Sequence, residues 1–262
     1  MLTMIFIFSI CFAASTVGGV CGIGGGVIIK PLLDAADVMP VSTVSFLSGL
    51  TVLAMALINV YNSRKEGELE PRRSVPLGIG AAVGGIVGKY LFSALKETVR
   101  ADRIVGAVQA IVLGLLVVGT LLYVAFKKRI RSLNVDGRIV PVVIGTLLGI
   151  CSSFLGIGGG PMNLAVLYFF FSMDTKKAAV NSVLIILISQ VSSLIMSLLT
   201  NTVPTFEWGY LAAMVMAGAL GGYLSAKLHK KLSAATTDKL FIVLLFVIIG
   251  ICIYNAVRML TR

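Results

Sequence analysis

Cys21-Gly22-Ile23-Gly24-Gly25-Gly26 is the stretch that decides the fold, and it has a second copy in Leu155-Gly156-Ile157-Gly158-Gly159-Gly160. Both copies read Gly-Ile-Gly-Gly-Gly, and they lie 134 residues apart. Four glycines in five positions oppose a regular helix, because each costs about 1 kcal/mol relative to alanine. Each copy lies inside a long apolar run, and at membrane depth an unwound backbone is tolerated only where protein buries it or where it lines a cavity. The two copies therefore predict two helix breaks that form the functional centre.

The rest of the chain has the composition of an integral membrane protein. Of its 262 residues, 58% are hydrophobic and 13% are charged, whereas a soluble domain carries about 25% charged residues. The net charge of +11 would suit a nucleic-acid partner, but the basic residues lie in short loops between apolar segments. Lysine and arginine in such loops orient a protein in the membrane. We therefore expect a lipid bilayer around the chain and no nucleic-acid partner.

Eight apolar segments follow one another along the chain. Two of them, 2–33 and 139–171, contain the glycine breaks and are too long for a single crossing. A helix of 33 residues would run about 50 Å at 1.5 Å per residue, against a hydrocarbon core of about 30 Å. The others are close to the length of about 20 residues that crosses the core. These six segments are 41–61, 75–95, 104–126, 178–199, 208–228 and 240–257.

The two halves of the sequence repeat each other. Gly84-Gly85 recurs as Gly221-Gly222 at an offset of 137 residues, and Val41-Ser42-Thr43-Val44 is matched by Val180-Asn181-Ser182-Val183 at an offset of 139. Features that recur in one order at nearly one spacing indicate a duplication. We expect a first repeat at 1–130 and a second at 131–262 within one membrane domain, with the glycine pairs at close helix contacts.

The distribution of basic residues predicts the orientation of the repeats. If all eight segments crossed the membrane once, each side would receive eleven basic residues. If the two broken segments fold back as hairpins, one side receives 15 and the other seven. Only the second arrangement obeys the rule that lysine and arginine gather on the cytoplasmic side. It predicts two inverted repeats, each a hairpin followed by three crossings, in a bacterial-type inner membrane with both termini non-cytoplasmic.

Inverted repeats with broken helices are typical of secondary transporters. We expect helices to restart at Val27 and Pro161, where unpaired N–H groups carry about +0.5 charge. Two such N-termini facing each other would bind an anion without a buried cation, and polar residues on the following helices would complete the site. The predicted substrate-binding residues are Gly22, Gly24, Gly25, Gly26, Val27, Ser42, Thr43, Gly156, Gly158, Gly159, Gly160, Pro161, Asn181 and Ser182.

Other polar residues inside the segments allow two interpretations. Ser152 and Ser153 either add to the site or only pack between helices, and Gln109 is interpreted as an interhelical hydrogen-bonding group. Lys30 and Lys89 are the cations inside the segments. Snorkelling toward the membrane surface is the first interpretation of both lysines, and an electrostatic funnel for anions is the alternative.

The acidic residues and the motifs exclude several classes of site. All eleven acidic residues lie at or near segment ends, which predicts that no carboxylate proton relay lies inside the membrane. Any proton coupling would then use a proton carried by the substrate. The glycine block is not a G-x-G-x-x-G motif, and the sequence has no Walker A, HExxH or Ser/His/Asp set. We therefore expect neither an enzyme, nor a metal site, nor a cofactor.

The sequence resembles the TauE/SafE sulfite exporter family of membrane permeases. The resemblance rests on both glycine blocks, on Pro31-Leu32 after the first, and on Ser42-Thr43, Asn181-Ser182 and the repeated Gly-Gly pairs, and it extends over essentially the whole chain. It implies a transporter of anions in sulfur metabolism, such as sulfite, sulfoacetate or another organosulfonate, exported and coupled to an ion gradient. The second copy departs from the family pattern, because Ala165 stands where the first copy has its proline.

Together these observations predict an all-α membrane protein that acts as a secondary transporter of a small oxyanion bound at the two broken helices, and the family resemblance implies a sulfur-containing one. An anion channel of the same architecture and a transporter of non-sulfur carboxylates are the alternatives. A membrane assembly or sensor protein would need a docking element, and the longest loop, Lys127–Arg138, is short and basic. The sequence leaves the coupling ion, oligomer formation and any role of Cys21 open.

Overall fold

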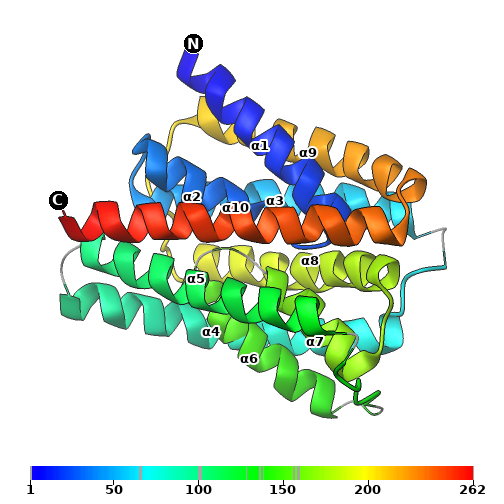
Figure 1. The fold of residues 1–262 in the computed structure, drawn as a ribbon. Helices are drawn as coiled ribbons and strands as arrows, with labels where there is room; N and C mark the ends of the chain where they lie inside the picture. Colours follow the sequence, from blue (N-terminus) through cyan, green and yellow to red (C-terminus); the bar gives the residue numbers. More distant parts are fainter. Residues whose placement is uncertain are drawn as a thin grey trace.

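The computed structural model describes residues 2–64, 67–99, 102–127, 129–135, 137, 139–155, 157 and 160–261. These residues form an all-helical bundle without strands (Figure 1). Seven of the helices, α1, α3, α4, α5, α8, α9 and α10, are long and apolar enough to cross a membrane. The helices are α1 (Leu2–Cys21), α2 (Gly26–Ala36), α3 (Val41–Ser63), α4 (Pro71–Val99), α5 (Asp102–Phe126), α6 (Ile139–Leu155), α7 (Pro161–Phe171), α8 (Thr175–Leu199), α9 (Trp208–Lys231) and α10 (Ala234–Thr261).

The six unbroken segments correspond to α3, α4, α5, α8, α9 and α10, and most of these helices are longer than their apolar cores. For example, α4 begins at Pro71 and α10 at Ala234, ahead of the hydrophobic stretch in each case. Proline is well suited to the first position of a helix, because its missing N–H would have had no partner there. Before α10, Ser233 Oγ accepts a hydrogen bond from the Thr236 amide at 3.2 Å, as an N-cap does. These polar first turns extend the helices beyond the apolar region.

Both broken segments consist of two helices, α1 and α2 in the first and α6 and α7 in the second. In the first, α1 ends at Cys21 and α2 begins at Gly26. Gly22 and Gly24 have φ values of +75° and +74°, a region that favours glycine. The Ile23 amide donates to the Gly18 carbonyl at 2.9 Å, and the corresponding Ile157 amide in the second segment donates to the Ser152 carbonyl at 3.3 Å. The first helix of each hairpin, α1 or α6, is therefore followed by the same type of backbone hydrogen bond.

The first hairpin has both of its ends at the end of the bundle where the chain termini lie (Figure 1). At the start of α1, Met4 lies against Gly209 in the first turn of α9. After α2, Asp37 pairs with Arg258 near the end of α10, with Nη2 and Oδ2 3.2 Å apart. With 11 residues, α2 spans only about 16 Å at 1.5 Å per residue, about half of the hydrocarbon core.

The second hairpin has its ends at the opposite end of the bundle, beside the start of α4. After the last turn of α7, the Phe171 carbonyl accepts a hydrogen bond from Arg73 Nη1 at 3.0 Å. Near the start of α6, Gly145 packs against the Leu77 carbonyl of α4. The helices α6 and α7 have 17 and 11 residues, so each is too short to cross the membrane alone.

Glycines allow the hairpins to pack closely on the helices beside them. The most extensive helix contacts are those of α6 with α4 and of α1 with α9. A Cβ atom at Gly84 would collide with the Thr146 carbonyl of α6, and one at Gly222 would collide with the Met55 carbonyl of α3. Gly221 lies equally close to Ser15 of α1. The expectation that the repeated glycine pairs mark close helix contacts is confirmed.

We expect Gly84→Ala to lower the thermal stability of the detergent-purified protein. The added methyl group meets a backbone carbonyl of α6 that cannot rotate away, and overpacking of this kind costs about 1–3 kcal/mol. Gly119→Ala in α5 is the matched control, because nothing lies within 4 Å of a Cβ atom there. Equal melting temperatures for the two variants would contradict the close α4–α6 contact.

Candidate functional site

The two glycine breaks lie against each other in the interior of the bundle. An ideal Cβ atom on Gly26 would lie 2.5 Å from the Ile157 carbonyl oxygen, and one on Gly160 would lie 3.2 Å from Val27 Cγ2. The helix α7 begins at Pro161, as predicted, and α2 begins at Gly26, one residue before the predicted Val27. The structure thus brings together the starts of α2 and α7, although the two helices are far apart in the sequence.

The backbone at the first restart has amide groups without acceptors. The Gly25 carbonyl accepts hydrogen bonds from the Ile28 and Ile29 amides at 3.0 and 2.9 Å. The amides of Gly25, Gly26 and Val27, in contrast, donate to no acceptor among the described residues. At the second restart the Gly160 carbonyl accepts from the Asn163 amide at 3.0 Å. The predicted residues Gly156, Gly158 and Gly159 lie outside the described residues.

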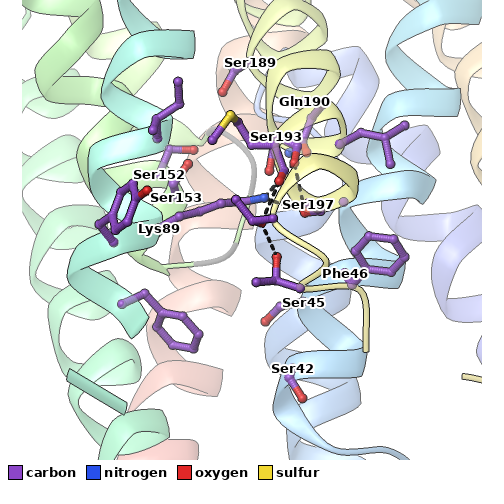
Figure 2. Close-up of a pocket in the computed structure, with 18 of the residues that line it drawn as sticks. Ser42, Ser45, Phe46, Lys89, Ser152, Ser153, Ser189, Gln190, Ser193 and Ser197 are labelled. Carbon is purple, nitrogen blue, oxygen red and sulfur yellow. Dashed lines mark hydrogen bonds between the residues drawn. The ribbon is translucent and has the colours of Figure 1, made fainter. Parts of the chain in front are cut away.

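A cavity of about 460 Å³ lies between α3, α4, α6 and α8 (Figure 2). Its lining comes from the first turns of α3, the last turns of α4, α6 and α8, Gln109 of α5, and the loop after α8. The exposed residues Tyr90, Thr200 and Thr202 belong to this lining, so the cavity reaches the protein surface. It opens toward the end of the bundle that carries both termini.

Lys89 is the single charged side chain among the described residues that line this cavity. Its ammonium group donates hydrogen bonds to the Ser193 carbonyl and to Ser197 Oγ, each at 2.6 Å. Figure 2 shows its side chain extending from α4 across to α8. The side chain therefore faces the cavity, as the funnel interpretation of Lys89 expects.

Serine residues from three helices line the same cavity as this ammonium group. Ser42 and Ser45 come from α3, and Ser152 and Ser153 come from the last turn of α6, directly before the second break. Ser45 Oγ and Ser152 Oγ are buried and have no hydrogen-bond partner among the described residues. Buried polar groups are nearly always paired, so unpaired hydroxyls facing a cavity indicate a place for a ligand or for water.

Of the predicted polar residues on α3 and α8, Ser42 belongs to the described lining of this cavity and the others do not. Ser42 lines it, and Thr43 donates from Oγ1 to the Thr205 carbonyl at 3.2 Å, which holds the loop after α8. Asn181 accepts from the Glu70 amide at 2.8 Å and from Ser74 Oγ at 2.6 Å, at the opposite end of the bundle. Ser182 is fully buried beside it on α8. The predicted substrate contacts of these residues stay predictions.

The described backbone residues of the predicted site lie outside the cavity lining. Gly22 packs against Ala179 of α8, and Gly24 lies 3.2 Å, measured from an ideal Cβ position, from the Ile186 side chain. Val27 and Pro161 are buried where the two hairpins meet. Among the described residues, Ser152 and Ser153 are the lining residues next to the second break, and whether an anion contacts the helix starts stays a prediction.

Several cavity residues were missing from the predicted site, although their spacing carries a signal. Ser189, Ser193 and Ser197 follow one another at intervals of four residues on α8. Such spacing places side chains on one face of a helix. Ser45, three residues after Ser42, extends the polar face of α3 in the same way. A search for polar faces within apolar segments would have found them.

Polar contacts join the helices at the end of the bundle opposite the cavity. Asn59 Nδ2 of α3 donates to Ser225 Oγ of α9 at 2.7 Å. His229, near the end of α9, is buried and lies 3.2 Å from Glu68 Oε2 and 3.2 Å from the Val20 carbonyl. The cavity is thus reachable from one end of the bundle, while polar bonds hold helices together at the other.

The position of Lys30 in the structure differs from the one that snorkelling toward the membrane surface predicts. Its side chain is 5% exposed and does not reach the membrane surface, so the snorkelling interpretation of Lys30 is wrong. Its ammonium group lies 3.0 Å from Asp34 Oδ2 and 3.1 Å from Gln109 Oε1. The amide of Gln109 donates in turn to the Phe154 carbonyl at 2.6 Å. Lys30 is held inside because the hairpin places it against α5 and α6 instead of lipid.

A comparison with protein-family models gives a match over nearly the whole chain. The family model is described as Sulfite exporter TauE/SafE, and it matches residues 7–251. The matched region begins within α1 and ends within α10, so it includes both glycine breaks and all described residues of the cavity lining. Neither a search of curated proteins nor a search of solved structures found a match.

Proposed function

The chain belongs to the TauE/SafE sulfite exporter family, and from this premise we propose that it is a secondary transporter of a small, sulfur-containing oxyanion in the inner membrane. The family is one of membrane transporters, and the seven long apolar helices agree with that role. Sulfite, sulfoacetate or another organosulfonate is the proposed substrate. The observation that carries the proposal is the ammonium group of Lys89 among unpaired serine hydroxyls in a cavity that reaches the surface.

We infer that the chain consists of two inverted repeats, 1–130 and 131–262. Two local features support this inference: α2 and α7 have 11 residues each, and each ends at a residue with left-handed φ, Asp37 and Ser172. The helix contacts of the two repeats correspond as well. The α1–α9 contact corresponds to the α6–α4 contact, and the α3–α9 contact corresponds to the α8–α4 contact. The hairpins open toward opposite ends of the bundle. The end with most of the basic loop residues would face the cytoplasm, which leaves both termini non-cytoplasmic.

The chemistry of the cavity suits an oxyanion. Lys89 is half-buried, and a charged residue inside a membrane-spanning segment marks a functional site by default. No carboxylate belongs to the described lining, so no negatively charged side chain there repels an anion. Serine hydroxyls donate hydrogen bonds from α3, α6 and α8, and an anion with three or four oxygens can accept from several sides at once. Passing along Ser152 and Ser153, the anion would reach the starts of α2 and α7, whose dipoles favour negative charge.

The cavity also has an apolar wall. Phe46, Leu50, Ile86 and Leu194 line it opposite or beside the polar groups. Its volume of about 460 Å³ exceeds what a bare sulfite needs, since pockets of about 300 Å³ upward already hold drug-sized molecules. This lining accommodates an oxyanion with a short organic group, as in an organosulfonate.

Access from one end favours a transporter over a channel of the same architecture. An open channel needs a continuous path, whereas polar contacts such as Asn59–Ser225 and Glu68–His229 join helices at the end opposite the cavity. In a transporter, the hairpins would move against the remaining helices so that access alternates between the two ends.

We expect the purified protein, reconstituted in liposomes, to carry sulfur oxyanions with saturation and with coupling to an imposed gradient. The panel consists of sulfite, thiosulfate, sulfate, sulfoacetate and isethionate, with acetate and succinate as carboxylate controls and protein-free liposomes as the blank. Flux that rises without saturation would identify a channel. A preference for the carboxylates, or no flux of any of these anions, would overturn the proposed substrate class.

A further inference from the structure

A buried ion pair lies on α2, one turn after the first break. Lys30 Nζ and Asp34 Oδ2 are 3.0 Å apart, and the two side chains are 5% and 6% exposed. Asp34 lies near the end of its segment, as expected from the sequence, and the hairpin buries its side chain against α5 and α10. An ion pair so far from water is costly, and a buried ionisable group in a membrane segment marks a functional position by default.

Two side-chain oxygen atoms at this ion pair lack a hydrogen-bond donor among the described residues. Asp34 Oδ1 and Asn255 Oδ1 are both buried, and neither has a hydrogen-bond partner among the described residues. Asn255 is otherwise fixed, because its Nδ2 donates to the Pro31 carbonyl at 3.0 Å. Both residues line a small cavity of about 20 Å³, which is close to the space that one water molecule needs. The residues that carry these two acceptors thus line one small space, and both acceptors lack a donor.

We propose that Asp34 is the proton-binding group that couples anion transport to the proton gradient, an inference that rests on the proposed function. The proton comes from water and binds at Asp34 Oδ1, where the O–H group becomes the donor that Asn255 Oδ1 lacks, either directly or through one water molecule. It returns to water when the anion is released on the other side. The substrate then needs no proton of its own.

Protonation of Asp34 favours anion binding by electrostatics. With Asp34 ionised, its charge neutralises that of Lys30 across a 3.0 Å contact. When Asp34 is protonated, the Lys30 ammonium is left uncompensated, and a positive charge remains in a medium of low dielectric constant close to the breaks. Because coupling between two binding sites is reciprocal, a bound anion also raises the affinity of Asp34 for its proton. Both effects give transport of the anion together with a proton.

Gln109 connects the ion pair to the large cavity. Its side chain belongs to the lining of both cavities. Gln109 Oε1 accepts from Lys30, and its Nε2 donates to the Phe154 carbonyl of α6, next to Ser152 and Ser153. Ile157, within the second break, lines the small cavity as well. A change in the charge of the pair is therefore transmitted to the part of α6 that borders the anion cavity.

The surroundings of Asp34 favour a proton over a metal cation. The Lys30 ammonium already occupies Oδ2, and a metal ion at Oδ1 would place a second full positive charge beside it. The described part of α5 faces the pair with the neutral amide of Gln109, and the sequences of α1, α3 and α7, which lie around α2, carry no charged residue. The other charged or titratable groups nearby are Asp37 on α2 and Cys252 and Arg258 on α10.

A measurement on the wild-type protein tests the linkage without any variant. Isethionate stays fully ionised across the neutral pH range, so it cannot carry a proton. We expect its addition to the purified protein in weak buffer to cause proton uptake, detected with a pH indicator dye, and its affinity to rise by at least about fivefold from mildly alkaline to mildly acidic pH. Binding without proton uptake would refute the proton-binding role of Asp34 while leaving the proposed transport function intact.

Asp34→Asn tests the residue, and Asp37→Asn is the matched control. Both substitutions remove one carboxylate near the end of the same hairpin arm, but the Asp37 side chain is 74% exposed and pairs with Arg258. In liposomes we expect D34N to retain anion exchange but to lose accumulation driven by a pH gradient, together with the pH dependence of affinity, whereas D37N keeps both. Replacing sodium by choline should leave wild-type transport unchanged.

Each alternative outcome has a distinct meaning. If the wild type carries none of the tested anions, the proposed function fails. If the wild type carries isethionate and D34N still accumulates it in response to a pH gradient, the role of Asp34 fails alone. A strict sodium requirement would replace the proton by a metal cation, and an unchanged pH profile in D34N would show that the small cavity holds only a structural water.

Discussion

Lys89→Met weakens binding of the transported anion by about 10- to 100-fold, since hydrogen bonds to charged groups contribute about 1.5–3 kcal/mol and about 1.4 kcal/mol corresponds to a tenfold change. Methionine matches the lysine side chain up to Cε and removes the only charge in the described cavity lining. The structural cost is small, because Ser197 Oγ still donates to the Ser193 carbonyl at 3.0 Å. Titration calorimetry with the best substrate of the liposome panel measures the loss, and the melting temperature of the free protein should stay near that of the wild type.

Lys227→Met is the control for this substitution. Lys227 is exposed on α9, with its ammonium group 4.5 Å from the centre of the Tyr223 ring, and it does not belong to the cavity lining. Its removal lowers the net charge by the same amount but leaves the cavity unchanged. If K227M weakened anion binding as much as K89M, the effect would reflect overall charge. Wild-type affinity in K89M would exclude this cavity as the anion site.

Gly26→Ala slows transport by about tenfold or more while the initial binding of the anion changes little. An added Cβ atom would lie 2.5 Å from the Ile157 carbonyl and 3.1 Å from Val52 Cγ2, so the two breaks would have to move apart. Overpacking strain costs about 1–3 kcal/mol. Added to the activation free energy of the hairpin movement, it lowers the transport rate about 5- to 150-fold. Because Gly26 is not part of the cavity lining, the maximal rate should fall with the KM close to that of the wild type.

Gly250→Ala in α10 supplies the comparison, because no atom lies within 4 Å of a Cβ atom at that position. Transport rates in liposomes, normalised to the amount of reconstituted protein, should be similar for G250A and the wild type. A fully active G26A would mean that the contact between the two breaks is not part of the transport cycle. A parallel loss of binding and rate in G26A would instead indicate general damage to the fold.

The sequence alone located the breaks and the helices around them. Glycines at Gly22 and Gly24 turn the chain because their backbone tolerates positive φ, and Pro161 begins α7 because proline suits the first helical position. The lengths of the apolar segments predicted the crossing helices, with errors only at polar ends such as Pro71. These features are local: each depends on the preferences of a few consecutive residues.

Only the tertiary structure decided which side chains meet. Asn181, predicted as a substrate contact, hydrogen-bonds to Glu70 and Ser74 more than 100 residues away in the sequence. Lys89 faces a cavity lined by residues of several helices, and the first hairpin buries Asp34 between α5 and α10 although its sequence position is the edge of an apolar segment. Such contacts depend on how each helix is rotated and on which helix packs against it. Those two properties follow from long-range packing, so the position of a residue within its own segment does not determine them.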